Sequence, residues 1–498
     1  MNEMTFLFLL SVLHASHYFS DTMDTDRGSW KVERASSTCS CYTRGLHRAV
    51  ACVCPVAHQT MPRWLLLGLT FALCVGFVSA SARRFVRIQG QRFVDAGTNA
   101  PVVLGGPNVV VKGPPWLPAV SGTKICNDVV NSACTAAGNC STCSTFNQAD
   151  VNHIKSVGWN FIRLGVVWAG AQPRDENTLD PDFLRRLHAI LNLTDANNIN
   201  VMLDNHGDMV GTAGCGNGMP MWFQKKAAPS FIGKPLVTGF PYDLVPSLSI
   251  KKTSGYNVCG DNATKWAAFA GDPYYNLKND CCKAINDGGN PGAVGFTKIS
   301  QASMDYMVQD GPGRKDFVRF WTLMAEAVKD HPSAVAMELM NEPMTIKRKD
   351  MFDTWKATAE AITAVIPDIS VNICDIGEAS LLPAWVTKLT GGAEFISKET
   401  IEWIKASNNV FYSWHYGTVP SNIKNMQEIS QKWNVPTFGT ELGCDQFKAA
   451  KAANISHSYW HYSAYCNTGP AFGNWKAPED TFGACILGWA SGGSSKCL

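Results

Sequence analysis

The sequence predicts an α/β fold, a (β/α)8 barrel of the TIM type. Eight apolar runs of strand-like length recur along the chain, and helical patterns alternate with them. Two of the runs end on a glutamate, as expected where parallel strands deliver functional groups to one face of a barrel. The predicted strands span residues 101–111, 159–167, 200–206, 334–340, 369–376, 409–415, 435–441 and 457–462.

Other patterns support this barrel. Residues 84–100 alternate apolar and polar side chains, which predicts an N-terminal β-hairpin that plugs the bottom of the barrel. In residues 181–196, Pro181 follows the predicted cap Asp180 and apolar residues recur on one helical face. Residues 313–331 show the same helical spacing.

Two stretches interrupt the regular alternation of strands and helices. Residues 119–148 and 209–312 are long, rich in Gly, Asn, Pro and Cys, and follow the first and third predicted strands. Loops that follow barrel strands lie on the active face. We therefore expect two long Cys-containing insertions there, where substrate is selected.

The first 82 residues divide into two parts. Residues 1–60 form a polar N-terminal extension, which is either expressed or a gene-model artefact upstream of Met61. Residues 61–82 have a short basic start, an apolar core and an A-x-A end, as in a signal peptide. The alternative is a membrane anchor over residues 64–80, a length at the lower limit for crossing a bilayer. Residues 83–498 would then form the barrel domain.

The cysteines favour an oxidising compartment. Of 18 cysteines, thirteen follow residue 82, and several cluster in polar, Gly-rich stretches, as in disulfide-stapled loops. A zinc site is disfavoured, since no C-x-x-C pairs with a second one or with a downstream His pair. Four N-x-S/T sequons, at Asn139, Asn192, Asn262 and Asn454, are compatible with glycosylation. We expect a secreted or lumenal protein, or one anchored by residues 64–80.

Composition excludes some classes of function. Of 498 residues, 46% are hydrophobic and 17% are charged, which is typical of a globular chain long enough for a barrel with insertions. The formal charge is +2 and no basic cluster occurs, so a nucleic-acid partner is not expected. An uncharged or weakly charged substrate fits better.

Two glutamates carry the predicted chemistry. Residues 337–343 read MELMNEP and residues 435–441 read VPTFGTE, which places Glu342 and Glu441 at the ends of apolar strands. A carboxylic acid and a carboxylate facing each other across a sugar cleave glycosidic bonds. The acid must be protonated and the second carboxylate ionised, which requires different surroundings for the two groups.

These residues resemble glycoside hydrolase family 5, the cellulase-like clan of (β/α)8 barrels. The resemblance runs from about residue 84 to residue 460 apart from the insertions, and it implies a retaining β-glycosidase. Asn341-Glu342-Pro343 is similar to the motif that closes the family's fourth strand. This implies Glu342 as general acid/base and Asn341 as a donor to the substrate 2-hydroxyl. Glu441, in TFGTELG, resembles the nucleophile. No metal and no organic cofactor is implied.

Further positions resemble the family's substrate-binding residues. Arg163, in FIRLGVVW, would contact the nucleophile as the cation that keeps it ionised. His415, in FYSWHYG, would lie near the acid/base, and Tyr416 takes the role of a family tyrosine because the expected position holds Gly417. Alone, each would more often be structural, but their shared place at strand ends favours a site. The remaining predicted sugar contacts are His206 and Asp208 in LDNHGD, and Trp460, an aromatic platform in HSYWHY.

Within the family, residues 107–118 and 204–222 look most like endoglycoceramidases, which release an intact glycan from ceramide. The resemblance implies a glycolipid or other carbohydrate substrate, with membrane association through the lipid as one consequence. Side chains of these segments would form an apolar lip for the lipid, or else anchor the loops to the barrel. They are Lys112, Trp116, Met219, Met221 and Trp222.

Other classes of function remain as alternatives. A metal-dependent barrel hydrolase would use His206, Asp208 and His415, but the H-x-H motif usual on its first strand is missing. A non-catalytic carbohydrate-binding barrel would be expected to lack one of the two glutamates. A β-glucan or mannan endo-hydrolase, or a steryl-glucosidase, belongs to the same family and differs in the insertions.

Overall fold

The computed structural model describes two compact units, Met1–Ala80 and Ser81–Leu498. The predicted signal segment 61–82, most of the insertion 119–148, and Tyr416 lie outside the described residues. The described parts are residues 20–24, 29–34, 37–43, 50–53, 84–120, 146–288, 291–374, 397–415 and 419–460.

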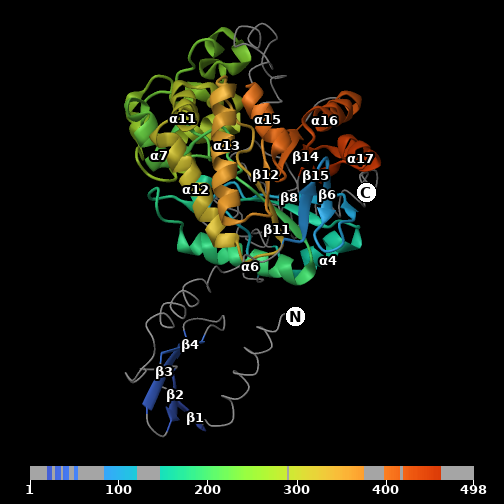
Figure 1. The fold of residues 1–498 in the computed structure, drawn as a ribbon. Coiled ribbons are helices and arrows are strands. Elements are labelled where there is room, and N and C mark those ends of the chain that lie inside the picture. Colours follow the sequence, from blue (N-terminus) through green and yellow to red (C-terminus); the bar gives the residue numbers. More distant parts are fainter. Residues whose placement is uncertain are drawn as a thin grey trace. The chain divides into compact units, whose positions relative to one another are not determined.

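The first unit contains four strands that pair antiparallel in chain order to form one sheet (Figure 1). They are β1 (Ser20–Asp24), β2 (Ser29–Arg34), β3 (Ser37–Thr43) and β4 (Val50–Val53). In the described parts of both units, no helix combines the length and the apolar character needed to cross a bilayer. The anchor predicted over residues 64–80 lies outside those parts.

The second unit is built on a closed barrel of eight parallel strands (Figure 1). Each strand pairs with the next in chain order, and β15 pairs with β8 to close the ring. Several strands are buried at every residue, because one face points into the barrel and the other is covered by helices. This confirms the predicted barrel. The strands are β8 (Gly105–Val109), β9 (Phe161–Gly165), β10 (Asn200–Asp204), β11 (Ala334–Glu338), β12 (Ser370–Asn372), β13 (Val410–His415), β14 (Thr437–Leu442) and β15 (Ser456–Tyr459).

The predicted hairpin closes the lower end of the barrel, where the strands begin. Strands β5 (Val86–Gln89) and β6 (Arg92–Asp95) pair antiparallel. The Phe93 ring of β6 lies 5.3 Å from that of Phe411, near the start of β13. One boundary was wrong, because the predicted strand 101–111 is two strands. Its first residues, β7 (Pro101–Val102), join the hairpin as a third strand, and only β8 enters the barrel. Only Val103 and Leu104 separate β7 from β8, and both continue the apolar run, so the change of sheet was not predicted from the sequence.

Helices surround the barrel, and α12 and α13 lie side by side against it (Figure 1). The two helices predicted from spacing are confirmed as α6 and α12. The side chain of Asp180 caps α6 by accepting bonds from the backbone of Asp182 and Phe183. The helices are α4 (Gln148–Ser156), α5 (Trp168–Ala171), α6 (Pro181–Asn197), α12 (Pro312–Val328), α13 (Arg348–Val365), α15 (Lys398–Ala406), α16 (Val419–Trp433) and α17 (Cys444–Ala452).

The insertion of residues 209–312 follows β10 and folds into short helices around a small core of its own. Two disulfides, Cys215–Cys282 and Cys259–Cys281, tie its segments together, as the clustered cysteines predicted. Its helices are η1 (Thr212–Gly214), α7 (Met221–Ala227), η2 (Pro229–Phe231), η3 (Tyr242–Leu244), η4 (Pro246–Leu248), η5 (Ile250–Lys252), η6 (Ser254–Val258), α8 (Ala263–Ala267), α9 (Tyr275–Lys278), α10 (Asp280–Gly288), η7 (Pro291–Phe296) and α11 (Lys298–Val308).

Candidate active site

The two predicted glutamates meet at the carboxyl ends of the barrel strands. Glu441 lies on β14, whereas Glu342 lies in the loop that follows β11. Each contributes a carboxylate oxygen, and His415 at the end of β13 contributes a ring nitrogen, to a group of atoms within 4.8 Å of one another. This spacing leaves room for one reacting atom between the two carboxylates.

Glu441 is buried among positive charges. Its Oε1 lies 2.6 Å from Nη1 of Arg163 and 3.7 Å from Nδ1 of His206. Its Oε2 lies 3.9 Å from Nδ1 of His415. Burial opposes ionisation, but the positive charges of His415, Arg163 and Lys112 outweigh it and hold the pKa of Glu441 well below its ordinary value. This carboxyl group is therefore ionised at neutral pH.

Glu342 has different surroundings. Its side chain is 19% exposed, and its Oε1 lies 3.2 Å from Nδ1 of His415. Its backbone is in the left-handed region, with φ of 41°, a conformation that costs energy for a residue with a side chain. Strained backbone of this kind is common at functional sites, where the surrounding structure holds it.

Arg163 joins most of the site through its guanidinium group, which is fully buried. A guanidinium carries five N–H groups, and here each of them faces an acceptor. Because burying a charge is costly unless it is paired, this complete pairing explains how an arginine is tolerated inside an apolar strand. The acceptors are the side-chain oxygens of Asn108, Asp204, Glu338, Asn341 and Glu441.

Asp204 and Glu338 were not predicted from the sequence as site residues. Both are completely buried, and they are register partners on β10 and β11. Burial, reinforced by the negative charge of Glu441, raises the pKa of Asp204 to about 7 against the opposing effect of Arg163. Burial and the charge of Asp204 also raise the pKa of Glu338. Their signal in the sequence is an acidic residue inside an apolar run, which needs a buried cation as partner.

The other side of the site is formed by the loop after β10. Nδ1 of His206 lies 2.7 Å from Oδ2 of Asp204, and its Nε2 lies 3.5 Å from Oδ1 of Asp208. Burial lowers the pKa of His206 to about 4, so its ring is neutral at ordinary pH. The ring stacks on Trp460 at a centroid distance of 5.1 Å. These residues form one continuous wall beside the glutamates.

Lys112 also belongs to the site. Its Nζ lies 2.6 Å from Oδ2 of Asp208 and 4.6 Å from the ring centre of Trp460. Asn341 accepts a bond of 2.8 Å from Arg163, and its Nδ2 lies 3.5 Å from Oδ1 of Asp208. The structure thus gathers every predicted site residue that it describes, and Tyr416 lies outside the described residues.

The predicted apolar lip is wrong for most of its members. Trp116, Met219 and Met221 are buried, so they anchor loops to the interior. Trp116 packs so closely on Gly170 that a Cβ there would lie 2.3 Å from the indole. Trp222 is half-buried, and Lys112 points into the polar site. Of the predicted lip, Trp222 is therefore the apolar side chain that remains partly exposed.

The alternative of a metal-dependent hydrolase requires His206, Asp208 and His415 as ligands. In the described part of the chain, the side chains spaced for a metal ion are instead Glu342, His415 and Glu441. A cation held there would neutralise the two carboxylates on which glycosidic cleavage depends. The geometry therefore does not gather the ligand set of the alternative hydrolase.

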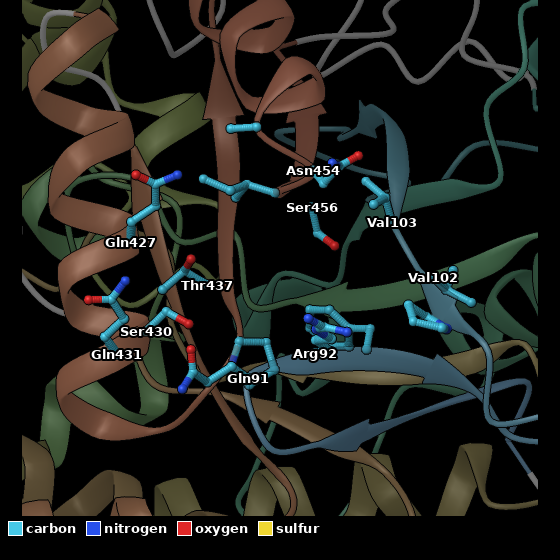
Figure 2. A pocket seen from close by; sticks show the side chains of 15 residues that line it. Gln91, Arg92, Val102, Val103, Gln427, Ser430, Gln431, Thr437, Asn454 and Ser456 are labelled. Atoms are coloured by element: carbon cyan, nitrogen blue, oxygen red, sulfur yellow. The ribbon is translucent and has the colours of Figure 1, made fainter.

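A cavity of about 570 Å³ lies at the opposite end of the barrel (Figure 2). Its wall joins the hairpin with the starts of β14 and β15, for example through Arg92, Thr437 and Ser456. Amide side chains such as Gln91 and Gln427 surround it. Conserved chemistry in barrels of this type is carried by the other face. The cavity contains none of the site residues and is separate from the glutamates.

Comparisons with known proteins bear on this site. The chain is 25% identical over 239 residues to an endoglycoceramidase of Cyanea nozakii, covering 48% of this chain and 37% of that protein. It is 25% identical over 240 residues to an endoglycoceramidase of Hydra vulgaris, covering 48% and 36%. The match thus spans little more than a third of the length of these curated relatives. Among solved structures, endo-glycoceramidase II from Rhodococcus sp. is 18% identical, with 78% of each chain covered and a TM-score of 0.46.

A family model gives the broader assignment. The model described as cellulase, glycosyl hydrolase family 5, matches residues 127–237 and 298–466. The gap between the two segments corresponds to most of the disulfide-bonded insertion, and the matched segments contain both glutamates, Arg163 and His415. Since the matched segments make up more than half of the chain, the protein belongs to glycosyl hydrolase family 5.

Proposed function

We propose that the protein is a retaining β-glycosidase. One observation carries the proposal: carboxylate oxygens of Glu342 and Glu441 lie within 4.8 Å of each other. Retaining enzymes place their two carboxyl groups about 5 to 5.5 Å apart, whereas inverting enzymes need about 6.5 to 9.5 Å to admit a water molecule. The short separation favours direct attack by one carboxylate on the sugar.

The surroundings of the two glutamates assign their roles. Glu441 is ionised and fixed by Arg163, so it attacks the anomeric carbon and forms a glycosyl-enzyme ester. Glu342 is partly exposed and protonates the departing glycosidic oxygen. It then takes a proton from water, which releases the sugar and frees Glu441 for the next cycle.

The remaining side chains would hold the sugar. The indole of Trp460 offers a flat apolar face to a sugar ring, and Lys112 and Asp208 offer charged groups for its hydroxyls. His415 lies between the two glutamates and can bond to either of them. It would maintain their relative position as negative charge moves from Glu441 to the leaving group.

We infer that the substrate is a glycolipid from which an intact glycan is released. The support is the similarity to endoglycoceramidases, which extends over 239 and 240 residues at 25% identity in the two relatives described above. We also propose that the protein is secreted. Two disulfides within the insertion are a feature of proteins that mature in an oxidising compartment.

The test is hydrolysis of a substrate panel by the purified full chain beside Glu441→Ala. The panel contains a ganglioside, a β-glucosylceramide, a steryl glucoside, cellulose and laminarin oligomers, and mannan. We expect release of an intact glycan from a glycolipid, and no release by the variant. Activity confined to a polysaccharide would keep the glutamate mechanism and reject the lipid substrate. Inactivity of folded protein on the whole panel would contradict the proposal.

A further inference from the structure

Exposed apolar side chains gather in one part of the described chain. The large hydrophobic side chains that are exposed all belong to residues 237–269, within the disulfide-bonded insertion. Three of them fall within eight residues: Val237 is 38% exposed, Phe240 75% and Leu244 57%. We call these three residues the apolar knoll. Exposed apolar clusters on a soluble protein usually mark a surface that binds something.

The apolar knoll lies over a small hydrophobic core. Beneath it, the buried side chains of Tyr242, Val245, Leu248 and Phe296 form a separate small core. The backbone at the knoll is also tied down, because Lys298 N donates to the carbonyl of Val237 at 2.8 Å. The apolar tips are therefore held outward by packing underneath them and are not a loose loop that could fold back.

The same core contacts the loop that carries Glu342. Met344 and Ile346, which follow Glu342 closely in the chain, pack against the small core under the knoll. The carbonyl of Met344 accepts a bond of 3.0 Å from Gln301. Contact at Gly295 is so close that a Cβ there would lie 2.1 Å from the sulfur of Met344. The knoll is thus a fixed neighbour of the acid/base loop.

Positive charge accompanies the knoll. Residues 229–261 contain three lysines and two aspartates, one of which, Asp261, pairs with Lys251 at 3.4 Å, so this segment has a net charge of +1. The exposed side chain of Lys298 also runs along Gly239, next to Phe240, with its Cγ 3.2 Å from the position of an added Cβ. An apolar tip with the cationic side chain of Lys298 beside it matches the apolar interior and anionic surface of a membrane.

We propose that the apolar knoll docks onto an anionic lipid bilayer and brings the face with Glu342 to the membrane surface. Phe240 and Leu244 enter the acyl boundary, while Lys298 contacts a lipid phosphate. The inference deepens the proposed function and rests on it for its purpose, since a glycolipid substrate is embedded in such a surface. Because binding is measured without turnover, it is tested separately.

The experiment measures flotation of the full chain with vesicles of phosphatidylcholine containing phosphatidylserine. The variants are the double substitution Phe240→Ser with Leu244→Ser, and Phe269→Ser as a matched control that is 54% exposed but outside the knoll. We expect the wild-type protein to float with the vesicles. The double variant should lose at least about tenfold in vesicle partitioning, since each buried side chain contributes that much. The control should change by less than about twofold.

Several outcomes would overturn the inference: no binding by the wild type, unchanged binding by the double variant, or equal loss in the control. Self-association that depends on Phe240 and Leu244 would also overturn it, in favour of a second copy of the chain. Hydrolysis of a water-soluble aryl β-glycoside is measured in parallel and should be unchanged in the double variant. Hydrolysis without vesicle binding rejects the docking surface alone. Vesicle binding without any hydrolysis rejects the proposed glycosidase alone.

Discussion

Glu342, in the loop that follows β11, and Glu441, on β14, have opposite surroundings. Glu441 is part of its strand, is 3% exposed and faces Arg163, His206 and His415. Glu342 lies beyond its strand in strained backbone, is 19% exposed and contacts His415. The carboxylate of Glu441 is therefore held ionised and stationary, whereas that of Glu342 is placed where protons can be exchanged with water.

The largest effect should come from removing the ionised glutamate. Glu441→Ala should lower kcat/KM on the order of 10⁴-fold or more, because no covalent intermediate can form. Added azide would enter the vacated space and give a glycosyl azide of inverted configuration. In Glu342→Ala, azide would instead attack the glycosyl-enzyme and give the retained configuration. Product stereochemistry is read by NMR, and an exchange of the two outcomes would reverse the roles.

Glu342→Gln should have the next largest effect. Loss of the proton donor should cost about 10²- to 10⁴-fold with a natural alkyl leaving group. A dinitrophenyl leaving group departs without protonation, so formation of the glycosyl-enzyme from that substrate should be nearly normal. The two substrates are compared by burst kinetics. Equal losses with both would show that Glu342 acts in some other way than proton transfer.

Substitution of Arg163 tests why the surroundings of Glu342 and Glu441 differ. Arg163→Met leaves Asp204, Glu338 and Glu441 without their cation, and it should lower the free energy of unfolding by about 3–5 kcal/mol. Arg185→Met is the matched control. Its ion pair with Asp182 is exposed, so its loss should cost about 0–1 kcal/mol. Urea denaturation measures both, and similar costs for the two variants would show that the buried network contributes little.

The sequence predicted the barrel and the glutamates because both depend on local patterns. Arg163 was also predictable, since a cation inside an apolar run requires a buried anion. Asp204 and Glu338 were missed because they become its partners only when the strands close side by side. The sequence also did not show which apolar side chains of a loop point inward and which point outward. Met219 and Phe240 are both apolar residues of one insertion, yet the first is 1% exposed and the second 75%. No periodic pattern distinguishes inward from outward in a loop.

The smallest predicted effect concerns Asp204, the buried acid that faces Arg163. In the folded protein the pKa of Asp204 is raised to about 7, whereas an unfolded aspartate has a pKa of about 3.9. The folded state therefore binds more protons than the unfolded state between about pH 4 and pH 7. The free energy of unfolding should fall as pH rises through this window and level off above it. Lowering of the pKa of Glu441 acts in the opposite sense and loses its contribution at more acidic pH.

Asp204→Asn removes the titrating proton, so subtracting its stability curve from that of the wild type cancels the contribution of Glu441. Relative to the wild type, the variant should gain stability from about pH 4 to pH 7, by up to about 4 kcal/mol. Glu338→Gln should give a difference of the same sign, because burial also raises the pKa of that group. Urea unfolding at a series of pH values measures both curves. If Asp204 is instead ionised in the folded protein, the slope reverses, and Arg163 rather than burial controls this end of the barrel.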